Sequence, residues 1–166
     1  MNVFDQVPAA GNEAPPFLDQ QDGELSQETT AAGAMALVIS PDGIVLHLRD
    51  EKSWIPHPGC WSLFGGAVEE GESPAQTVVR ELEEELGLED VVCRPLWRVV
   101  DTGGDGRLLT IFEARTQQRP DDMTLTEGQA LRAYDRHTAL TLKLAPFCRR
   151  VLERYVPEQQ TGARPC

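Results

Sequence analysis

The sequence predicts an α/β fold in which helices pack on the faces of a mixed sheet. Three observations predict it. Apolar runs typical of strands come in two groups along the chain, and each group is followed by a stretch with the apolar spacing of a helix. The chain has 166 residues, which is enough for one domain but not for two. Hydrophobic residues make up 40% and charged residues 25%, as in ordinary globular proteins.

The first 30 residues are predicted to form an arm outside the domain, because they combine prolines and glutamines with little periodic apolar pattern. The domain is expected to cover residues 31–157, followed by a polar tail at 158–166. Four apolar residues of the arm would gain from burial on the domain or on a twofold partner: Val3, Phe4, Phe17 and Leu18.

A hairpin is predicted to open the domain, because two apolar runs flank the turn signal Pro41-Asp42-Gly43. Two prolines and a glycine then predict a loop, and a short strand leads into a tight turn at Gly65 and Gly66. The expected bounds are 35–39 and 44–48 for the hairpin strands, 50–60 for the loop and 61–64 for the short strand.

The best-marked element is a helix from Pro74 to about Leu86. Ser73 can cap it, Pro74 suits its first turn, and Gly87 can end it in the left-handed conformation. Its apolar residues recur at helical spacing and predict one buried face. These residues are Ala75, Val78, Val79, Leu82 and Leu86.

The second group of strands is predicted at 96–100, 108–114 and 131–134, with a glycine-rich turn at 103–106 between the first two. A last helix should begin at Pro146 and end near residue 156.

The formal net charge of -12 argues against binding to duplex nucleic acid, because the phosphate backbone would be repelled. A single nucleotide remains compatible, since a bound cation can reverse the local field. The sequence has no apolar run long enough to span a membrane and no secretion signal at its start, so we expect a cytoplasmic protein without a membrane partner.

Three glutamates of the helix, Glu81, Glu84 and Glu85, are three or four residues apart or adjacent and therefore share one region of space. Like charges at this spacing near a helix C-terminus repel each other and the helix dipole. A hard divalent cation, Mg²⁺ or Mn²⁺, would compensate them. The alternative from spacing alone is a solvated acidic face.

The whole stretch around these glutamates resembles the Nudix box. That motif is a glycine, five residues, Glu, seven residues, Arg-Glu, an apolar residue, any residue, Glu-Glu, any residue, Gly and an apolar residue. All seven identities are present: Gly66, Glu72, Arg80, Glu81, Glu84, Glu85 and Gly87. The resemblance covers about residues 33–156 and implies the Nudix α/β/α sandwich with a mixed central sheet.

The resemblance also implies roles for individual residues. Glu81, Glu84 and Glu85 would bind metal or the attacking water, with the Gly65 carbonyl as a further metal ligand. Gly66, Glu72, Arg80 and Gly87 would be structural, with Arg80 paired to Glu72. Glu127, in a Glu-Gly-Gln setting that resembles MutT-type members, is a candidate general base or extra ligand. Its alternative is an exposed loop carboxylate.

The implied activity is metal-dependent hydrolysis of a diphosphate bond in a nucleoside diphosphate derivative, either a nucleoside triphosphate or a nucleotide sugar. The alternatives are a Nudix-fold module that binds nucleotide without hydrolysis and a diphosphate isomerase, the latter prompted by His57, Cys60 and Trp61. A homodimer is a further expectation of the resemblance. The leaving group stays open, and the stretch 143–148 lacks the asparagine with which some MutT-type members read an oxidised purine.

Tryptophan and histidine side chains outside the box could also contact the substrate. Trp54 lies in the loop before the box and is the candidate for stacking on a nucleobase. No motif surrounds His47, His57 or His137, so we expect them at the surface or in loops, without a role.

Overall fold

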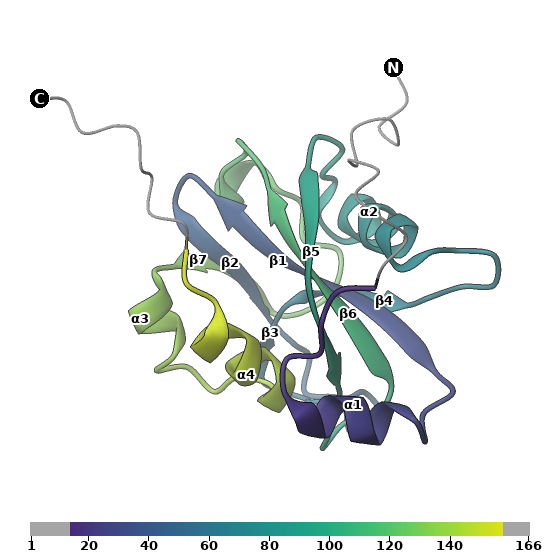
Figure 1. Cartoon of the computed structure of the whole chain (residues 1–166). Coiled ribbons are helices and arrows are strands. Elements are labelled where there is room, and N and C mark those ends of the chain that lie inside the picture. Colours follow the sequence, from purple (N-terminus) through teal and green to yellow (C-terminus); the bar gives the residue numbers. More distant parts are fainter. Residues whose placement is uncertain (1–13, 158–166) are drawn as a thin grey trace, which may run out of the picture.

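The computed structural model describes residues 14–157 and shows a mixed seven-stranded sheet between helices (Figure 1). The strands are β1 (Ala32–Ser40), β2 (Gly43–Leu48), β3 (Trp61–Ser62), β4 (Phe64–Ala67), β5 (Val92–Val100), β6 (Leu108–Arg115) and β7 (Ala130–Tyr134). β1 and β6 pair in parallel, and the other pairs are antiparallel. The α/β sandwich with a mixed sheet is therefore confirmed.

The centre of the sheet is forked. One edge of β1 carries β6 along its length, while the other edge pairs with β4 at 33–36 and with β2 only at 38–40. β2 in turn pairs with β3 through His47 and Leu48. The segment 61–67 therefore pairs first with β2 and then with β1, and it fills the space where these two strands diverge.

The tight turn predicted at Gly65 and Gly66 was wrong, because both residues belong to β4 and pair with Met35 and Ala34 of β1. Glycine is needed there for another reason. Gly65 has a φ of +150°, and a Cβ at this position would collide with the Ala34 carbonyl oxygen. Gly65 thus allows close contact between β4 and β1 rather than a reversal of the chain.

Alternate residues of the sheet point to opposite faces and belong to two separate hydrophobic cores. On one face, residues such as Ala36 and Val38 pack against Val78 and Leu82 of α2 (Pro74–Leu86). On the other face, residues such as Leu37 pack under α4 (Pro146–Arg154). Figure 1 shows α2 on one side of the sheet and α1, α3 and α4 on the other.

The bounds predicted for α2 are confirmed. The Ser73 hydroxyl accepts a hydrogen bond from the Gln76 amide at 3.2 Å, and Pro74 occupies the first turn. Gly87 ends the helix with φ 66° and ψ 22°, and its amide donates to the Glu83 carbonyl. Because both ends are fixed locally, the register of the glutamates on this helix is fixed as well.

Residues 14–30 lie against the domain and include a helix that was not predicted, α1 (Gln20–Ser26). Leu18 is buried in the core under α4. The carboxylate of Asp22 is also buried, where it accepts from the Val100 amide at 3.0 Å and from Arg150 at 2.6 Å. Val3, Phe4 and the predicted tail at 158–166 lie outside the described residues, and the predicted division of the chain stays a prediction.

Two further elements complete the α4 side. α3 (Arg136–Ala139) was not predicted, and α4 ends two residues before the predicted end. A 3-10 turn at Pro120–Asp122 precedes the loop that leads to β7. No helix within residues 14–157 is long and apolar enough to cross a membrane.

Candidate functional site

Two box glutamates meet the backbone of β4 at its two glycines. A Cβ on Gly66 would lie 2.5 Å from Glu81 Oε1, so the absence of a side chain there leaves room for the carboxylate. The Gly65 amide donates a hydrogen bond to Glu85 Oε2 at 3.0 Å. The box therefore places Glu81 and Glu85 against one short piece of strand.

Arg80 holds the box together through four carboxylates. Its Nε lies 2.7 Å from Glu72 Oε2 and its Nη2 lies 3.0 Å from Glu72 Oε1, which is a two-point contact. Its Nη1 reaches Glu81 at 2.9 Å and Glu84 at 3.3 Å; Glu69 lies 3.7 Å away. The hydrogen bonds from Arg80 lower the pKa of Glu72 to about 2. The Arg80–Glu72 contact implied by the family motif is therefore present.

The loop that carries Glu127 is fixed on both sides. Thr126 binds the C-terminal end of α2, because its amide donates to the Glu85 carbonyl at 3.1 Å and its hydroxyl to the Glu84 carbonyl at 3.0 Å. Gln129 binds β2 through its amide, which donates to the Leu48 carbonyl at 2.8 Å. Glu127 is far from the box in the sequence. These contacts nevertheless bring it within electrostatic range of Glu81 and Glu85.

Negative charge accumulates where these elements meet. Burial, the charge of Glu81 and, to a lesser extent, that of Glu127 raise the pKa of Glu85 to about 8. Burial also raises the pKa of Glu81, against the effect of Arg80. Burial penalises the charged form of a carboxylate, and a neighbouring carboxylate adds to the penalty. A cation at this place would remove that penalty, so the donor chemistry fits Mg²⁺ or Mn²⁺.

The structure does not gather the three box glutamates that the family motif implies as ligands. Glu84 is 60% exposed and faces Arg80. No group of three or more His, Cys, Asp or Glu side chains within residues 14–157 is placed to hold a metal ion. What the fold brings together is Glu81, Glu85 and the Gly65 backbone, with Glu127 near them.

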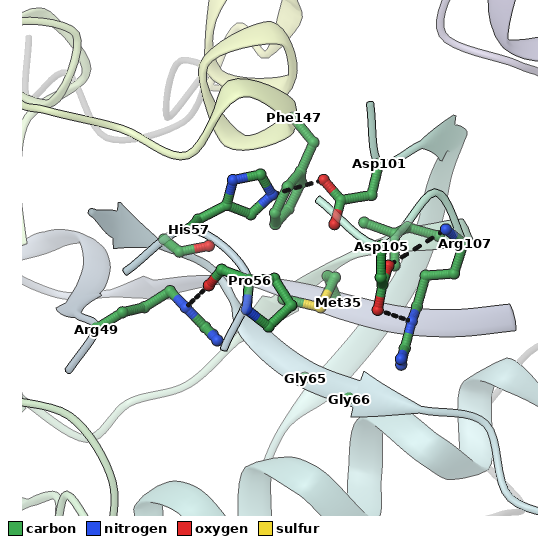
Figure 2. Close-up of a pocket in the computed structure, with 12 residues that line it drawn as sticks. Met35, Arg49, Pro56, His57, Gly65, Gly66, Asp101, Asp105, Arg107 and Phe147 are labelled. Atoms are coloured by element: carbon green, nitrogen blue, oxygen red, sulfur yellow. Dashed lines mark hydrogen bonds and ion pairs between the residues drawn. The ribbon is translucent and has the colours of Figure 1, made fainter. Parts of the chain in front are cut away.

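A cavity of about 190 Å³ lies beside the same two glycines, on the other face of the sheet (Figure 2). Met35 and Leu109 line it, and both belong to the core under α4, whereas Glu81 approaches Gly66 from the α2 side. Gly65 and Gly66 therefore separate the carboxylates from the cavity.

A buried histidine and a buried aspartate face each other in this cavity. His57 Nε2 lies 2.7 Å from Asp101 Oδ1, and each side chain is 6% exposed. Figure 2 shows the pair opposite Gly65 and Gly66, with Phe147 next to the His57 ring. The turn after β5 passes close by, since a Cβ on Gly104 would collide with Asp101 Oδ2.

The cavity site formed by His57, Ser62 and Asp101 was missed in the sequence, because none of these three residues lies in the box motif. The expectation for His47 was wrong: it is buried in β2, stacks on Phe64 and hydrogen-bonds the Leu63 carbonyl at 2.9 Å. His57 lies in a loop as expected, but its side chain is buried. His137 is exposed. Trp54 is 79% exposed and does not line the cavity.

The comparison with known families gives a result that agrees with this geometry. The model of the NUDIX domain matches residues 29–155. The chain belongs to the Nudix family. This assignment confirms the resemblance seen in the box and accounts for the forked sheet and the capped glutamate helix.

Individual Nudix relatives are similar to this chain over part of their length. An uncharacterised Nudix hydrolase of Pseudomonas aeruginosa is 33% identical over 109 residues, which are 59% of this chain and 64% of the relative. A CTP pyrophosphohydrolase of Escherichia coli is 43% identical over 58 residues, 35% of this chain and 42% of the relative. The matches thus span less than two thirds of these curated relatives.

Solved structures show the same fold. The Nudix hydrolase RenU of M. smegmatis has a TM-score of 0.58 at 26% identity. The match covers 75% of this chain and 81% of the RenU chain. The NUDIX domain of Shewanella oneidensis NrtR, solved with ADP-ribose, has a TM-score of 0.62 at 20% identity. It covers 75% of this chain and 85% of its own, and at this identity it supports the fold alone.

Proposed function

We propose that this Nudix domain hydrolyses a diphosphate bond in a nucleoside diphosphate derivative and that it requires Mg²⁺ or Mn²⁺. One observation carries the proposal: Glu81 and Glu85 are held against Gly65 and Gly66 as a partly buried pair of carboxyl groups, whose charged forms are disfavoured unless a cation compensates them. A polyanionic substrate cannot approach such a pair unless a cation is present. The similarity to a CTP pyrophosphohydrolase supports the same reaction class.

The residues of the box would divide the work as follows. Glu81, Glu85 and the Gly65 carbonyl would hold the cation, which supplies positive charge for the diphosphate oxygens. Arg80 orients Glu81, and the Gly65 amide orients Glu85. Glu84 would join the ligands only after leaving Arg80.

Water would attack one phosphorus, so that a new P–O bond forms and the bridging P–O bond breaks. Glu127 is the proposed acceptor of the proton from that water, because its loop is fixed by Thr126 and Gln129 at the edge of the carboxylates. A homodimer and a cytoplasmic location also stay proposals, on the sequence arguments given above.

A substrate panel tests the proposal. Nucleoside triphosphates, 8-oxo-dGTP, nucleotide sugars and ADP-ribose would each be incubated with the full chain in Mg²⁺, in Mn²⁺ and in excess chelator, with released nucleoside monophosphate as the readout. We expect turnover of at least one compound, and only with a cation. Equal turnover in chelator, or no turnover of any compound, contradicts the proposal.

A further inference from the structure

We propose that the cavity beside Gly65 and Gly66 binds a nucleobase with an exocyclic amino group, as in cytosine or adenine, and that Asp101, oriented by His57, selects this group. The inference rests on the proposed function, because it assigns the other end of the same substrate. It concerns residues outside the box, which the carboxylate side does not use.

The size and walls of the cavity fit one ring system. Its volume of about 190 Å³ is below the roughly 300–1,000 Å³ of pockets that enclose a whole drug-sized ligand. Met35, Leu109 and Phe147 give it apolar walls, and charged side chains of Arg49, Asp105 and Arg107 also line it. A flat ring is therefore favoured over a flexible polar group.

The position of the cavity fits the base end of a nucleotide. It extends to Gly65 and Gly66, and the opposite side of these two residues contacts Glu81 and Glu85. A nucleotide whose diphosphate lies at the carboxylates can therefore pass around this strand and place its base in the cavity.

Asp101 offers one acceptor atom to the ligand. A carboxylate oxygen accepts hydrogen bonds, so His57 Nε2 carries the hydrogen that joins it to Asp101 Oδ1. Asp101 Oδ2 has no hydrogen bond within residues 14–157. The backbone of Gly104 approaches this oxygen closely, and the absence of a side chain there keeps a Cβ from colliding with it. An amino group of a base can donate to Oδ2, whereas a carbonyl at the same place would bring two acceptors together.

Ser62 adds a second polar group without a partner. It lines the cavity, is 1% exposed, and its hydroxyl makes no hydrogen bond within the described part of the chain. A buried polar atom without a partner is unfavourable, and a ligand that supplies the partner removes the cost. The hydroxyl can donate to the ring nitrogen next to the amino group, N3 of cytosine or N1 of adenine.

The backbone at His57 is held in an unusual conformation. His57 is the non-glycine residue with positive φ, 51°, within residues 14–157. Such a conformation persists only where the surroundings enforce it, and it is commonly found at ligand sites. Here the bond to Asp101 and the contact with the Phe147 ring, 5.9 Å between centroids, enforce it.

The first test compares bases that differ in the exocyclic amino or carbonyl group and in the hydrogen on the adjacent ring nitrogen: CTP with UTP, and ATP with ITP, in Mg²⁺. We expect kcat/KM to favour the amino member of at least one pair by about tenfold or more, since one well-placed base contact discriminates by this amount. Asp101→Asn should bring the ratio near one, because an amide can donate as well as accept. Asp42→Asn, in an exposed turn, is the matched control and should keep the wild-type ratio.

The second test does not depend on hydrolysis. Binding of CMP, UMP, AMP and IMP is measured by calorimetry in excess chelator, with wild type, Asp101→Asn and Ser62→Ala. We expect tighter binding of the amino member, with the preference lost in Asp101→Asn and the affinity lowered several-fold in Ser62→Ala. If Asp101→Asn fails to fold, Ser62→Ala and the wild-type preference decide.

The two tests separate the two proposals. Turnover with equal kcat/KM for both members of both pairs overturns the assignment of the cavity and leaves the proposed hydrolysis standing. Preferential binding of CMP or AMP without turnover of any compound in the substrate panel supports the cavity and contradicts the hydrolysis. A folded Asp101→Asn that keeps the wild-type preference also overturns the role of Asp101.

Discussion

The two sides of the Gly65-Gly66 strand handle charge in opposite ways. On the α2 side, Glu81 is paired with Arg80, whereas the Glu85 carboxyl accepts from the Gly65 amide, and burial and the charge of Glu81 raise the pKa of Glu85 to about 8. On the α4 side, the carboxylates are paired one to one: Asp101 with His57 at 2.7 Å and Asp105 with Arg107 at 2.7 Å.

The two sides therefore differ in whether their negative charge is compensated. The α2 side needs a cation to relieve repulsion between the partly buried carboxylates of Glu81 and Glu85. The cavity needs none, and its free polar atoms, Asp101 Oδ2 and Ser62 Oγ, can select a ligand by hydrogen bonding. Changes on the first side should therefore act on turnover, and changes on the second on affinity and base preference.

The largest effect on turnover is expected from Glu85→Gln on the α2 side. It removes one charge from the α2 side at nearly constant volume, so we expect turnover to fall at least about tenfold while binding of nucleoside monophosphate is unchanged. Glu83→Gln is the matched control, because Glu83 is exposed on the same helix. An unchanged rate for Glu85→Gln across the substrate panel would return the glutamates to a solvated helix face.

Gly104→Ala tests the cavity side. A Cβ at this position would collide with Asp101 Oδ2, so the turn or the His57–Asp101 pair must shift. We expect KM for the preferred nucleotide to rise about fivefold with little change in kcat, because the loss is one of ground-state binding. Thr102→Ala, an exposed change in the same turn, should leave both constants unaltered. A fall in kcat at constant KM would contradict the separation of the two sides.

The α2 side could be predicted from the sequence because its information is contiguous. Ser73, Pro74 and Gly87 fix the ends of one helix, and the spacing of Glu81 and Glu85 within it decides their common face. The proximity of Glu127 could be predicted only from the family resemblance, since it depends on how the loop after β6 binds α2 and β2.

The cavity could not be predicted in the same way. His57, Ser62 and Asp101 come from a loop, a two-residue strand and a strand end, and they meet because the strand 61–67 crosses from β2 to β1. No local periodicity encodes that crossing. α1 was missed for a related reason: its stability comes from Leu18 and Asp22, which bind distant parts of the chain.

Arg80→Ala should have an intermediate effect on the α2 side. It removes the group that orients Glu81 and pairs with Glu72, so we expect a several-fold lower rate and a lower denaturation midpoint, with base preference retained. A double-mutant cycle with Glu72→Gln should give a non-zero coupling in the unfolding free energy. Additive effects of the two changes would refute the pairing as a source of stability.

The stability of the sheet depends on pH through His47 of β2, whose ring stacks on Phe64 of β4. Burial lowers the pKa of His47 to about 4, below the usual value of about 6.5. The unfolded chain therefore binds a proton between these values that the folded chain cannot, so this stability is present above pH 6.5 and is lost as pH falls towards 4.

His47→Gln measures that term, since the new side chain takes no proton. Relative to wild type, its unfolding free energy should gain about 1 to 3 kcal/mol between pH 7 and pH 4.5, as a pKa shift of this size permits. Denaturant titrations at the two pH values give the difference, and His137→Gln, at an exposed position, is the control. A constant difference between His47→Gln and wild type would show that His47 does not titrate differently on folding.

The smallest effect on the rate is expected from deletion of residues 1–30, which tests whether the cavity depends on the N-terminal segment. Asp22 accepts from the amide of Val100, the residue before Asp101, so the segment touches the cavity side through the backbone. The pairing of β5 with β6 holds Val100 independently, opposite Leu108. We therefore expect a chain starting at Ala31 to keep its rate per active site and its base preference.

The stability of the truncated chain should fall, because the buried contacts of Leu18 disappear and Arg150 loses the Asp22 carboxylate. Calorimetric unfolding and the paired-substrate assay measure the two quantities. A folded, truncated chain that loses base preference would show that the segment helps to position Asp101, and one that loses turnover by orders of magnitude would make it part of the active site.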